Sequence, residues 1–276
     1  MIKISASLTV QYDNIFSPFL GSEWRKGMAW AKGCGFDGIE LIITDPNLLD
    51  PDEILFEAQA NSLVISTIST GQAMGMEALS LVSAKQYIRE ATQARLRDDI
   101  DFSVRLGRPN VTIGLIRGRG GEHPSYVEKN LLLRELSRLI DYAAKRGIVL
   151  NLEPINRYEV CWINSTDEGY ELLQKLGMPE NCGLLYDTFH SNIEDADMRN
   201  AILRNHKKIT HVHFADSNRR LPGEGHIDFD LILKTLNEVD YNGFISLEVL
   251  NLPSAEHIQK NAAKCFHNII KYKAGV

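Results

Sequence analysis

Four ionisable residues stand at or near the ends of apolar segments in the second half of the chain. They are Glu153, Asp187, His213 and Glu248, and successive members are 34, 26 and 35 residues apart. Three carboxylates in one place repel one another and raise one another's pKa values unless a positive charge lies between them. A divalent cation is the simplest such charge, so these four residues are candidate metal ligands.

The donor set of three carboxylates and one imidazole is hard to borderline, which suits Mn, Mg or Co and leaves Zn possible. His211 precedes His213 by two positions, and residues two apart on a strand share a face, so either could be the ligand. We assign His213 because it lies nearer the carboxyl end of its segment. The alternative is that Glu153 and Glu248 are buried carboxylates held in hydrogen-bonded networks without a metal.

The elements that would position these residues are short apolar runs that alternate with longer amphipathic stretches. This alternation is typical of parallel strands joined by crossover helices. One such stretch, residues 131–147, closes on basic residues and Gly147, as helices often do. The expected strands are residues 2–7, 38–43, 64–69, 110–116, 148–154, 182–188, 209–216 and 243–250.

Eight such units without a long insertion favour a closed (β/α)8 barrel over an open doubly wound sheet. The spacing of the four candidate ligands is about one βα repeat, so they would converge at the carboxyl ends of the last four strands, where barrel active sites form. The chain has neither a GxGxxG sequence after its first strand nor a GxxxxGK[ST] sequence. The common phosphate-binding loops are therefore missing.

Composition limits the class of protein. With 276 residues, 44% hydrophobic and 24% charged, we expect one globular domain over residues 1–276. A formal net charge of −6 argues against non-specific binding to nucleic acid or an anionic membrane, and favours a small-molecule partner. Four scattered cysteines suggest buried thiols, with neither a disulfide framework nor a thiolate zinc site. The lack of a leader or a membrane span predicts a cytoplasmic protein.

Five segments carry a resemblance to a known family. In order and spacing, they resemble the sugar phosphate isomerase/epimerase branch of the xylose isomerase-like TIM barrel superfamily, which includes the D-tagatose and D-psicose 3-epimerases. The likeness spans nearly the whole chain. The segments are GFDGIEL (35–41), LEPINRYE (152–159), YDTFH (186–190), HVHFADSNRRLPGEGHIDF (211–229) and ISLEVL (245–250).

The resemblance implies that Glu153, Asp187, His213 and Glu248 hold one metal ion. It also implies that Glu153 and Glu248 exchange protons with the substrate, one as general base and one as acid, through an enediolate. Substrate-binding roles would fall on the three residues that match the family's second Glu, His and Arg. These are Glu159, His190 and Arg219.

Arg117 and Arg119 stand among the glycines of Ile116–Gly121 and could grip a phosphate or carboxylate at the barrel mouth. A solvated loop is the alternative. The resemblance leaves the sugar and its phosphorylation open, and it allows a homodimer or homotetramer.

Three other functions compete with a metal-dependent isomerase or 3-epimerase. The first is a dehydratase of the inosose or 3-dehydroshikimate type, in which proton abstraction is followed by loss of water. The second is an endonuclease IV-like repair nuclease, which resembles the chain at His226 and Asp228. That nuclease needs further histidines after the third and fourth strands, where this chain has Ser69, Thr70 and Arg117. The third is a sugar-binding accessory protein without catalysis.

Overall fold

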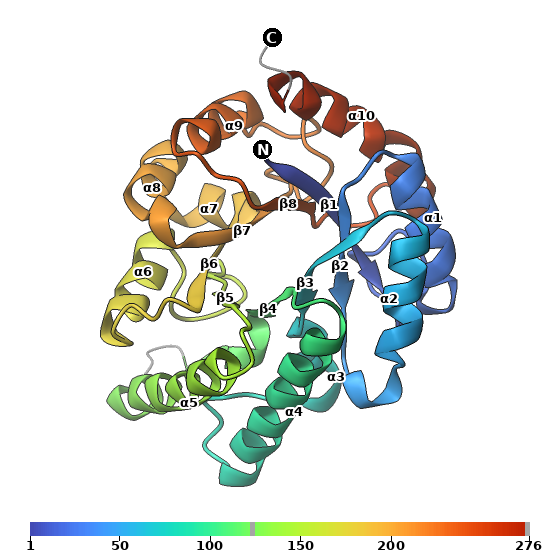
Figure 1. Cartoon of the computed structure of the whole chain (residues 1–276). Coiled ribbons are helices and arrows are strands. Elements are labelled where there is room, and N and C mark those ends of the chain that lie inside the picture. Colours follow the sequence, from blue (N-terminus) through green and yellow to red (C-terminus); the bar gives the residue numbers. More distant parts are fainter. Residues whose placement is uncertain (122–124, 274–276) are drawn as a thin grey trace.

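Eight parallel strands form a closed barrel in the computed structural model, which describes residues 1–121 and 125–273. Neighbours in the chain are neighbours in the sheet, and β8 pairs with β1 to close the ring (Figure 1). The predicted (β/α)8 barrel is confirmed. The strands are β1 (Lys3–Thr9), β2 (Gly38–Ile42), β3 (Val64–Ser69), β4 (Asn110–Ile113), β5 (Leu150–Leu152), β6 (Cys182–Asp187), β7 (Ile209–Phe214) and β8 (Phe244–Leu247).

Helices surround the barrel, and local sequence signals begin several of them. Ser125 with Glu128 and Ser165 with Glu168 form capping boxes, which satisfy free N–H groups in the first turns of α5 and α6. The surrounding helices are α1 (Trp24–Gly33), α2 (Pro51–Ala60), α4 (Gln86–Arg105), α5 (Tyr126–Ala144), α6 (Thr166–Lys175), α8 (Met198–Asn205), α9 (Phe229–Glu238) and α10 (Ala255–Lys273).

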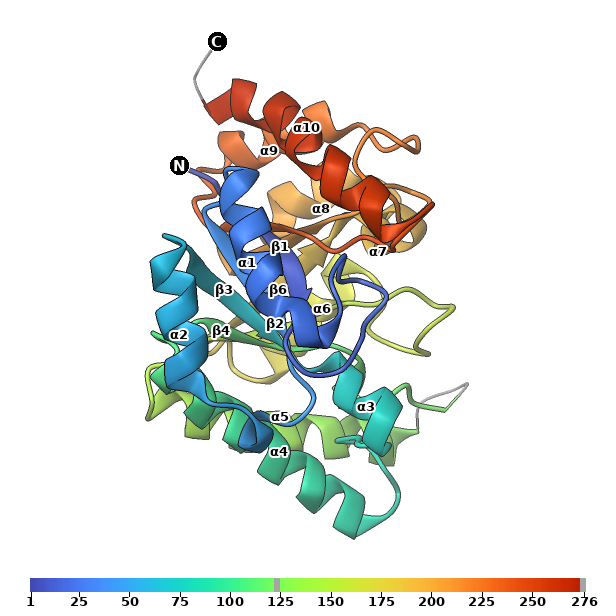
Figure 2. The ribbon, with the colours of Figure 1, turned by 90° about the vertical axis from the view of Figure 1, so that its right-hand side faces the viewer.

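Two short helices, α3 (Gly71–Glu77) and α7 (Thr188–Glu194), follow β3 and β6 directly. In Figure 2, α3 and the loops after β1 and β5 extend to the right-hand side of the barrel. This side is the carboxyl end of the strands, so the βα connections gather where a barrel builds its site.

The strands alternate between apolar residues that face the helices and polar residues that face the barrel axis. In β1, Ile4, Ala6 and Leu8 join the large buried hydrophobic cluster, whereas Ser5 and Ser7 alternate with them. Inside the barrel, Asn151 donates to Thr112 Oγ1 at 3.2 Å and to Thr67 Oγ1 at 3.4 Å. The main hydrophobic core therefore lies between the sheet and the helices, whereas the barrel interior contains hydrogen-bonded polar side chains.

Several strands are shorter than the sequence predicts, and the reason is local. The run 110–116 was expected to be extended, but β4 ends at Ile113 because Gly114 turns and Leu115–Arg117 forms a 3-10 helix. Likewise β5 and β8 end at Leu152 and Leu247, one residue before a candidate ligand. The expected helix over 131–147 begins earlier, at Tyr126, and ends at Ala144.

All four cysteines are free, and their surroundings differ. Cys182 is buried, Cys34 and Cys265 are half-buried, and Cys161 is exposed, so the expectation of four buried thiols is wrong for Cys161. Within the described ranges, no helix has the length and apolar character needed to cross a membrane.

Candidate metal centre

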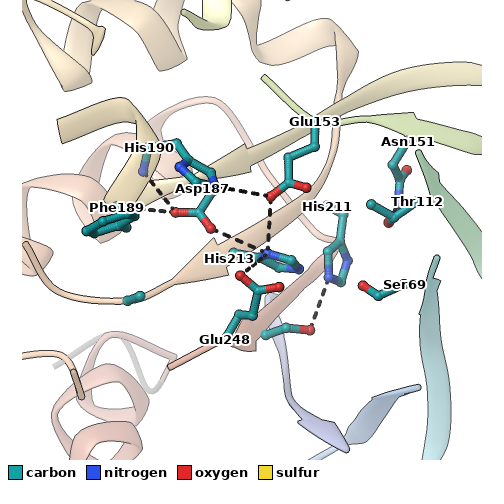
Figure 3. Close-up of polar contacts among 12 residues, drawn as sticks. Ser69, Thr112, Asn151, Glu153, Asp187, Phe189, His190, His211, His213 and Glu248 are labelled. Atoms are coloured by element: carbon teal, nitrogen blue, oxygen red, sulfur yellow. Dashed lines mark hydrogen bonds and ion pairs between the residues drawn. The ribbon is translucent and has the colours of Figure 1, made fainter. Parts of the chain in front are cut away.

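The structure brings the four candidate ligands together around one nitrogen. His213 Nδ1 lies 3.5 Å from Asp187 Oδ2, 3.6 Å from Glu248 Oε2 and 3.8 Å from Glu153 Oε1. One donor atom from each residue lies within 4.8 Å of the other three. Figure 3 shows the three carboxylates converging on His213 from separate strand ends.

The barrel scaffold holds each carboxylate in place. Gly114, just after β4, leaves room for Glu153, because a Cβ at position 114 would overlap Glu153 Oε2. Asp187 is the N-cap of α7, where its Oδ1 accepts the backbone N–H groups of Phe189 at 2.7 Å and His190 at 3.1 Å. Its second oxygen, Oδ2, is left to face the centre.

Two atoms of this cluster show that it fits a cation. Asp187 Oδ2 and His213 Nδ1 are both buried, and neither has a hydrogen-bond partner. Burying a polar atom without a partner costs free energy, so unpaired atoms of this kind call for a ligand. A divalent cation between them would bind oxygen and imidazole donors that suit Mn, Mg, Co or Zn.

The electrostatics of the cluster reflect the crowding of charge. Burial and the neighbouring Glu248 raise the pKa of Glu153 to about 8. Burial also acts to raise the pKa of Asp187, but His190, His213 and Arg219 bring it below its ordinary value. For His213, burial acts to lower the pKa, yet Glu40 and Glu248 hold it well above the ordinary value. The cluster thus retains protons that a metal would displace.

The choice between the two histidines agrees with this geometry. His211 Nε2 lies 3.0 Å from Glu40 Oε2 and 3.0 Å from Ser246 Oγ, so that ring is bonded within the barrel interior. His213 alone of the two presents a nitrogen to the three carboxylates.

Glu40 lies directly beside His213, although the sequence pattern did not mark it as a candidate site residue. It is fully buried in β2, and its carboxylate contacts both histidines of β7. The sequence did contain a sign of this position, because Glu40 is an acidic residue between Ile39 and Leu41 in the segment GFDGIEL. In the sheet it pairs with Ser7 of β1, which also faces the barrel interior.

The three predicted substrate-binding residues lie beside the metal ligands. Arg219 donates from Nη1 to Glu159 Oε1 at 3.0 Å and from Nη2 to Glu248 Oε2 at 3.2 Å. The rings of Phe16 and Phe189 each lie 4.6 Å from its guanidinium carbon. The planar cation is thus held between two aromatic rings and two carboxylates.

His190 is oriented by Asn156. The Nδ2 atom of Asn156 lies 2.9 Å from Glu159 Oε1, which can only accept, so Nδ2 is a donor there and also to His190 Nδ1 at 2.7 Å. Burial keeps the pKa of His190 below its ordinary value, so the ring is neutral and its proton lies on Nε2. That nitrogen lies 3.7 Å from Glu153 Oε1 and 3.4 Å from Arg219 Nη2, which can only donate, so a substrate oxygen between the two side chains would accept from both.

A cavity of about 290 Å³ opens above these residues. Its lining includes Glu153, Glu248, His190 and Arg219 together with apolar residues such as Ile42, Met74 and Leu115. Arg119 is exposed and lines this cavity, as an anion-binding role at the mouth would require.

Arg117 does not lie where the sequence analysis placed it. It is 1% exposed, and its guanidinium donates to the carbonyls of Gly114, Trp162 and Ile163 at 3.0 to 3.2 Å. The 3-10 turn after β4 directs the side chain into the protein, away from the cavity lining. Arg117 is therefore a structural residue that ties the β4 and β5 connections together, and its expected grip on a substrate anion is wrong.

This difference predicts opposite effects for the two arginines. Arg117→Ala removes three buried hydrogen bonds and leaves a cavity in place of a fully buried side chain, so we expect it to lower the free energy of unfolding by about 3 kcal/mol or more. Arg119→Ala should change it by less than about 0.5 kcal/mol, because that side chain is exposed. Urea unfolding followed by circular dichroism measures both values, and equal losses would contradict the assignment.

The residues that suggested a nuclease lie elsewhere. His226 is exposed and pairs with Ser217 Oγ at 2.9 Å, and Asp228 is the N-cap of α9. Neither joins a group of candidate metal ligands among the described residues.

Comparison with known proteins identifies a family model and several sugar epimerases that are similar to this chain. Residues 28–269 match the family model for xylose isomerase-like TIM barrels. An L-ribulose 3-epimerase of Methylomonas sp. (strain DH-1) is 31% identical over 81% of this chain and 77% of its own length. A second L-ribulose 3-epimerase, from Mesorhizobium japonicum, is 29% identical over 88% of this chain and 80% of its own.

A solved structure shares the fold as well. The D-allulose 3-epimerase of Methylomonas sp., crystallised in complex with D-allulose, matches with a TM-score of 0.83 and 26% identity. The match covers 98% of this chain and 96% of the other.

Proposed function

Because the chain belongs to the xylose isomerase-like TIM barrel family, we propose that it is a divalent-metal-dependent 3-epimerase of a ketopentose or ketohexose. The observation that carries the proposal is the pair of unpartnered atoms, Asp187 Oδ2 and His213 Nδ1, at the centre of a three-carboxylate cluster beside a cavity. The relatives named as ketose and L-ribulose 3-epimerases support the substrate class.

Epimerisation at C3 needs a proton to leave one face of the carbon and another to arrive on the opposite face. A divalent ion held by Glu153, Asp187, His213 and Glu248 would supply Lewis acidity that stabilises negative charge developing on the substrate. In our proposal, one carboxylate takes the C3 proton while the electron pair moves to form the C2–C3 double bond of an enediolate. The other carboxyl group then returns a proton to C3, and the carbonyl re-forms.

Glu153 and Glu248 fit this exchange because their surroundings differ. Glu248 accepts a hydrogen bond from Arg219 Nη2 at 3.2 Å. Glu153 is buried and faces His190 Nε2 at 3.7 Å. Pairs of carboxyl groups with unequal surroundings can act as base and acid in one reaction. We therefore assign proton removal to one of the two carboxylates and proton return to the other, with the roles exchanged for the reverse epimerisation.

His190 and Arg219 would stabilise the charge that develops on the substrate oxygens. His190 Nε2 carries the proton that it can donate, and Arg219 is fixed by its two carboxylate partners and two aromatic rings. Glu159 acts through Arg219, to which it is hydrogen-bonded, and can also accept from a substrate hydroxyl.

The proposal is tested by incubating the Mn²⁺-loaded protein with L-ribulose or D-psicose in D₂O. We expect the C3 epimer to accumulate with one solvent deuterium at C3. Deuterium at C2 of an aldose product would instead indicate aldose–ketose isomerisation, and a product lighter by one water would indicate a dehydratase. No turnover with any ketose would contradict the proposal.

The raised pKa values predict that metal binding depends on pH. Glu153 is protonated below about pH 8 in the metal-free protein, and His213 also retains its proton. Both must lose a proton to bind a cation, so the affinity should rise as pH increases from 6 to 8, with about one to two protons released per ion. Titration calorimetry in two buffers of different ionisation enthalpy measures this number. Metal binding without proton release would contradict the prediction.

A further inference from the structure

Glu40 occupies the barrel interior directly behind the proposed metal centre. Its side chain is 0% exposed, and it is absent from the residues that line the cavity. His213 Nε2 lies 3.1 Å from its Oε1 and 3.0 Å from its Oε2, on the side of the ring opposite the three carboxylates. Glu40 is thus placed to act on His213 without reaching a substrate.

The environment of Glu40 keeps the carboxylate in one orientation. Ser69 Oγ donates to Oε1, and His211 Nε2 lies 3.0 Å from Oε2. The rings of His211 and His213 stand edge to face, with centroids 5.3 Å apart and an interplanar angle of 85°. Because both rings of β7 and the hydroxyl of Ser69 in β3 bond to this one buried carboxylate, neither ring can turn without breaking a buried hydrogen bond.

The chemistry of a carboxylate decides which nitrogen of His213 carries the proton. An ionised carboxylate can only accept, so Nε2 of the facing ring must be the donor. In the neutral ring, Nδ1 then has no hydrogen, and its lone pair is directed at Glu153, Asp187 and Glu248. With a hydrogen on Nδ1 instead, the same ring would be closed to a cation.

A second cation site is the other interpretation of these residues, because Glu40, His211 and His213 also place donor atoms within 4.8 Å of one another. The hydrogen bonds decide against it. The facing atoms of Glu40 and the two histidines already bond to one another, whereas Asp187 Oδ2 and His213 Nδ1 face each other at 3.5 Å without a hydrogen-bond partner. The cation therefore belongs with the four-residue cluster, and Glu40 supports it from behind.

We propose that Glu40 is a positioning residue that holds His213 in the tautomer and orientation required for metal binding and strengthens its Nδ1 as a donor. The inference rests on the proposed metal centre and extends it to a residue outside the ligand set. Metal-bound histidines commonly donate their other N–H to a carboxylate, and loss of that partner typically weakens metal binding about 10- to 100-fold.

The test compares Co²⁺ binding by the whole protein and its Glu40→Gln variant, by titration calorimetry and by the visible absorption of the bound ion. The amide has one acceptor oxygen for two rings and no negative charge. We expect Co²⁺ to bind about 10- to 100-fold more weakly, with an altered visible spectrum. Ser246→Ala is the matched control, since it removes another buried hydrogen bond of His211 but leaves Glu40 and His213 in contact. It should keep the parent affinity and spectrum.

Two further variants keep the test decisive if Glu40→Gln folds poorly. Glu40→Asp retains an acceptor-only group and should restore a spectrum of the parent type. In a His213→Ala background, Glu40→Gln should cause no additional loss of Co²⁺ affinity, because its effect passes through the missing ring.

Three outcomes would overturn the role. These are parent-like affinity and spectrum in Glu40→Gln, an equal loss in Ser246→Ala, or an additive loss without His213. Absence of Co²⁺ binding by the parent protein would instead overturn the proposed metal centre, and this role with it.

Discussion

Glu153→Gln and Glu248→Gln should each lower kcat by about 10³-fold or more. Each substitution keeps the shape of the side chain but removes a group that accepts or returns the C3 proton, and general acid–base catalysis contributes about 10² to 10⁴. Each also removes one anionic donor from the proposed metal centre, so the two losses combine. Initial rates with the Mn²⁺-loaded variants, at saturating ketose, measure the effect.

Matched controls separate this loss from general damage. Glu180→Gln changes an exposed glutamate and should leave kcat unchanged. Metal content, determined for each variant after loading, distinguishes lost chemistry from lost metal. Appreciable turnover by either site variant would remove that residue from the proton-transfer role.

Removal of the metal should abolish turnover while the barrel remains folded. The hydrophobic core lies between sheet and helices, away from the ligand cluster, so its packing does not depend on the ion. We expect activity to fall to background after treatment with a chelator and to return on addition of Mn²⁺, Co²⁺ or Mg²⁺. Turnover that is insensitive to a chelator, in a protein shown to contain no metal, would contradict the proposed mechanism.

Binding of the metal should also raise the stability of the folded protein. A ligand at about 100 times its Kd stabilises the folded state by about 2.7 kcal/mol, which for a chain of this size raises the Tm by roughly 5 to 10 °C. Asp187→Asn should remove most of that metal-dependent increase, because Asp187 Oδ2 is one of the two unpartnered atoms at the centre.

The sequence was sufficient to predict the barrel and the four residues that converge at its carboxyl end. Alternating apolar and polar positions show which residues face inward, and the repeat length places one ligand at the carboxyl end of each of the last four strands. The choice of His213 over His211 depended on a difference of two positions along one strand. The structure explains it, because His211 is committed to Glu40 and Ser246.

Glu40 and Arg117 show where the sequence was insufficient. Glu40 lies more than a hundred residues from the histidines that it contacts, and their proximity arises only when β2 and β7 face each other across the closed barrel. Arg117 was predicted to bind a substrate anion at the mouth of the barrel because it stands among glycines in the sequence. Its side chain instead turns inward to satisfy carbonyls of the loop after β5, and a sequence pattern does not report such partners.

Asp187 serves two elements with one side chain. Through Oδ1 it caps α7, the helix that carries His190, while Oδ2 faces the metal ligands. A substitution at position 187 would therefore remove the cap of the helix that carries His190 as well as one oxygen of the ligand cluster, so its effects on substrate contacts and on metal binding cannot be separated by changing this residue alone.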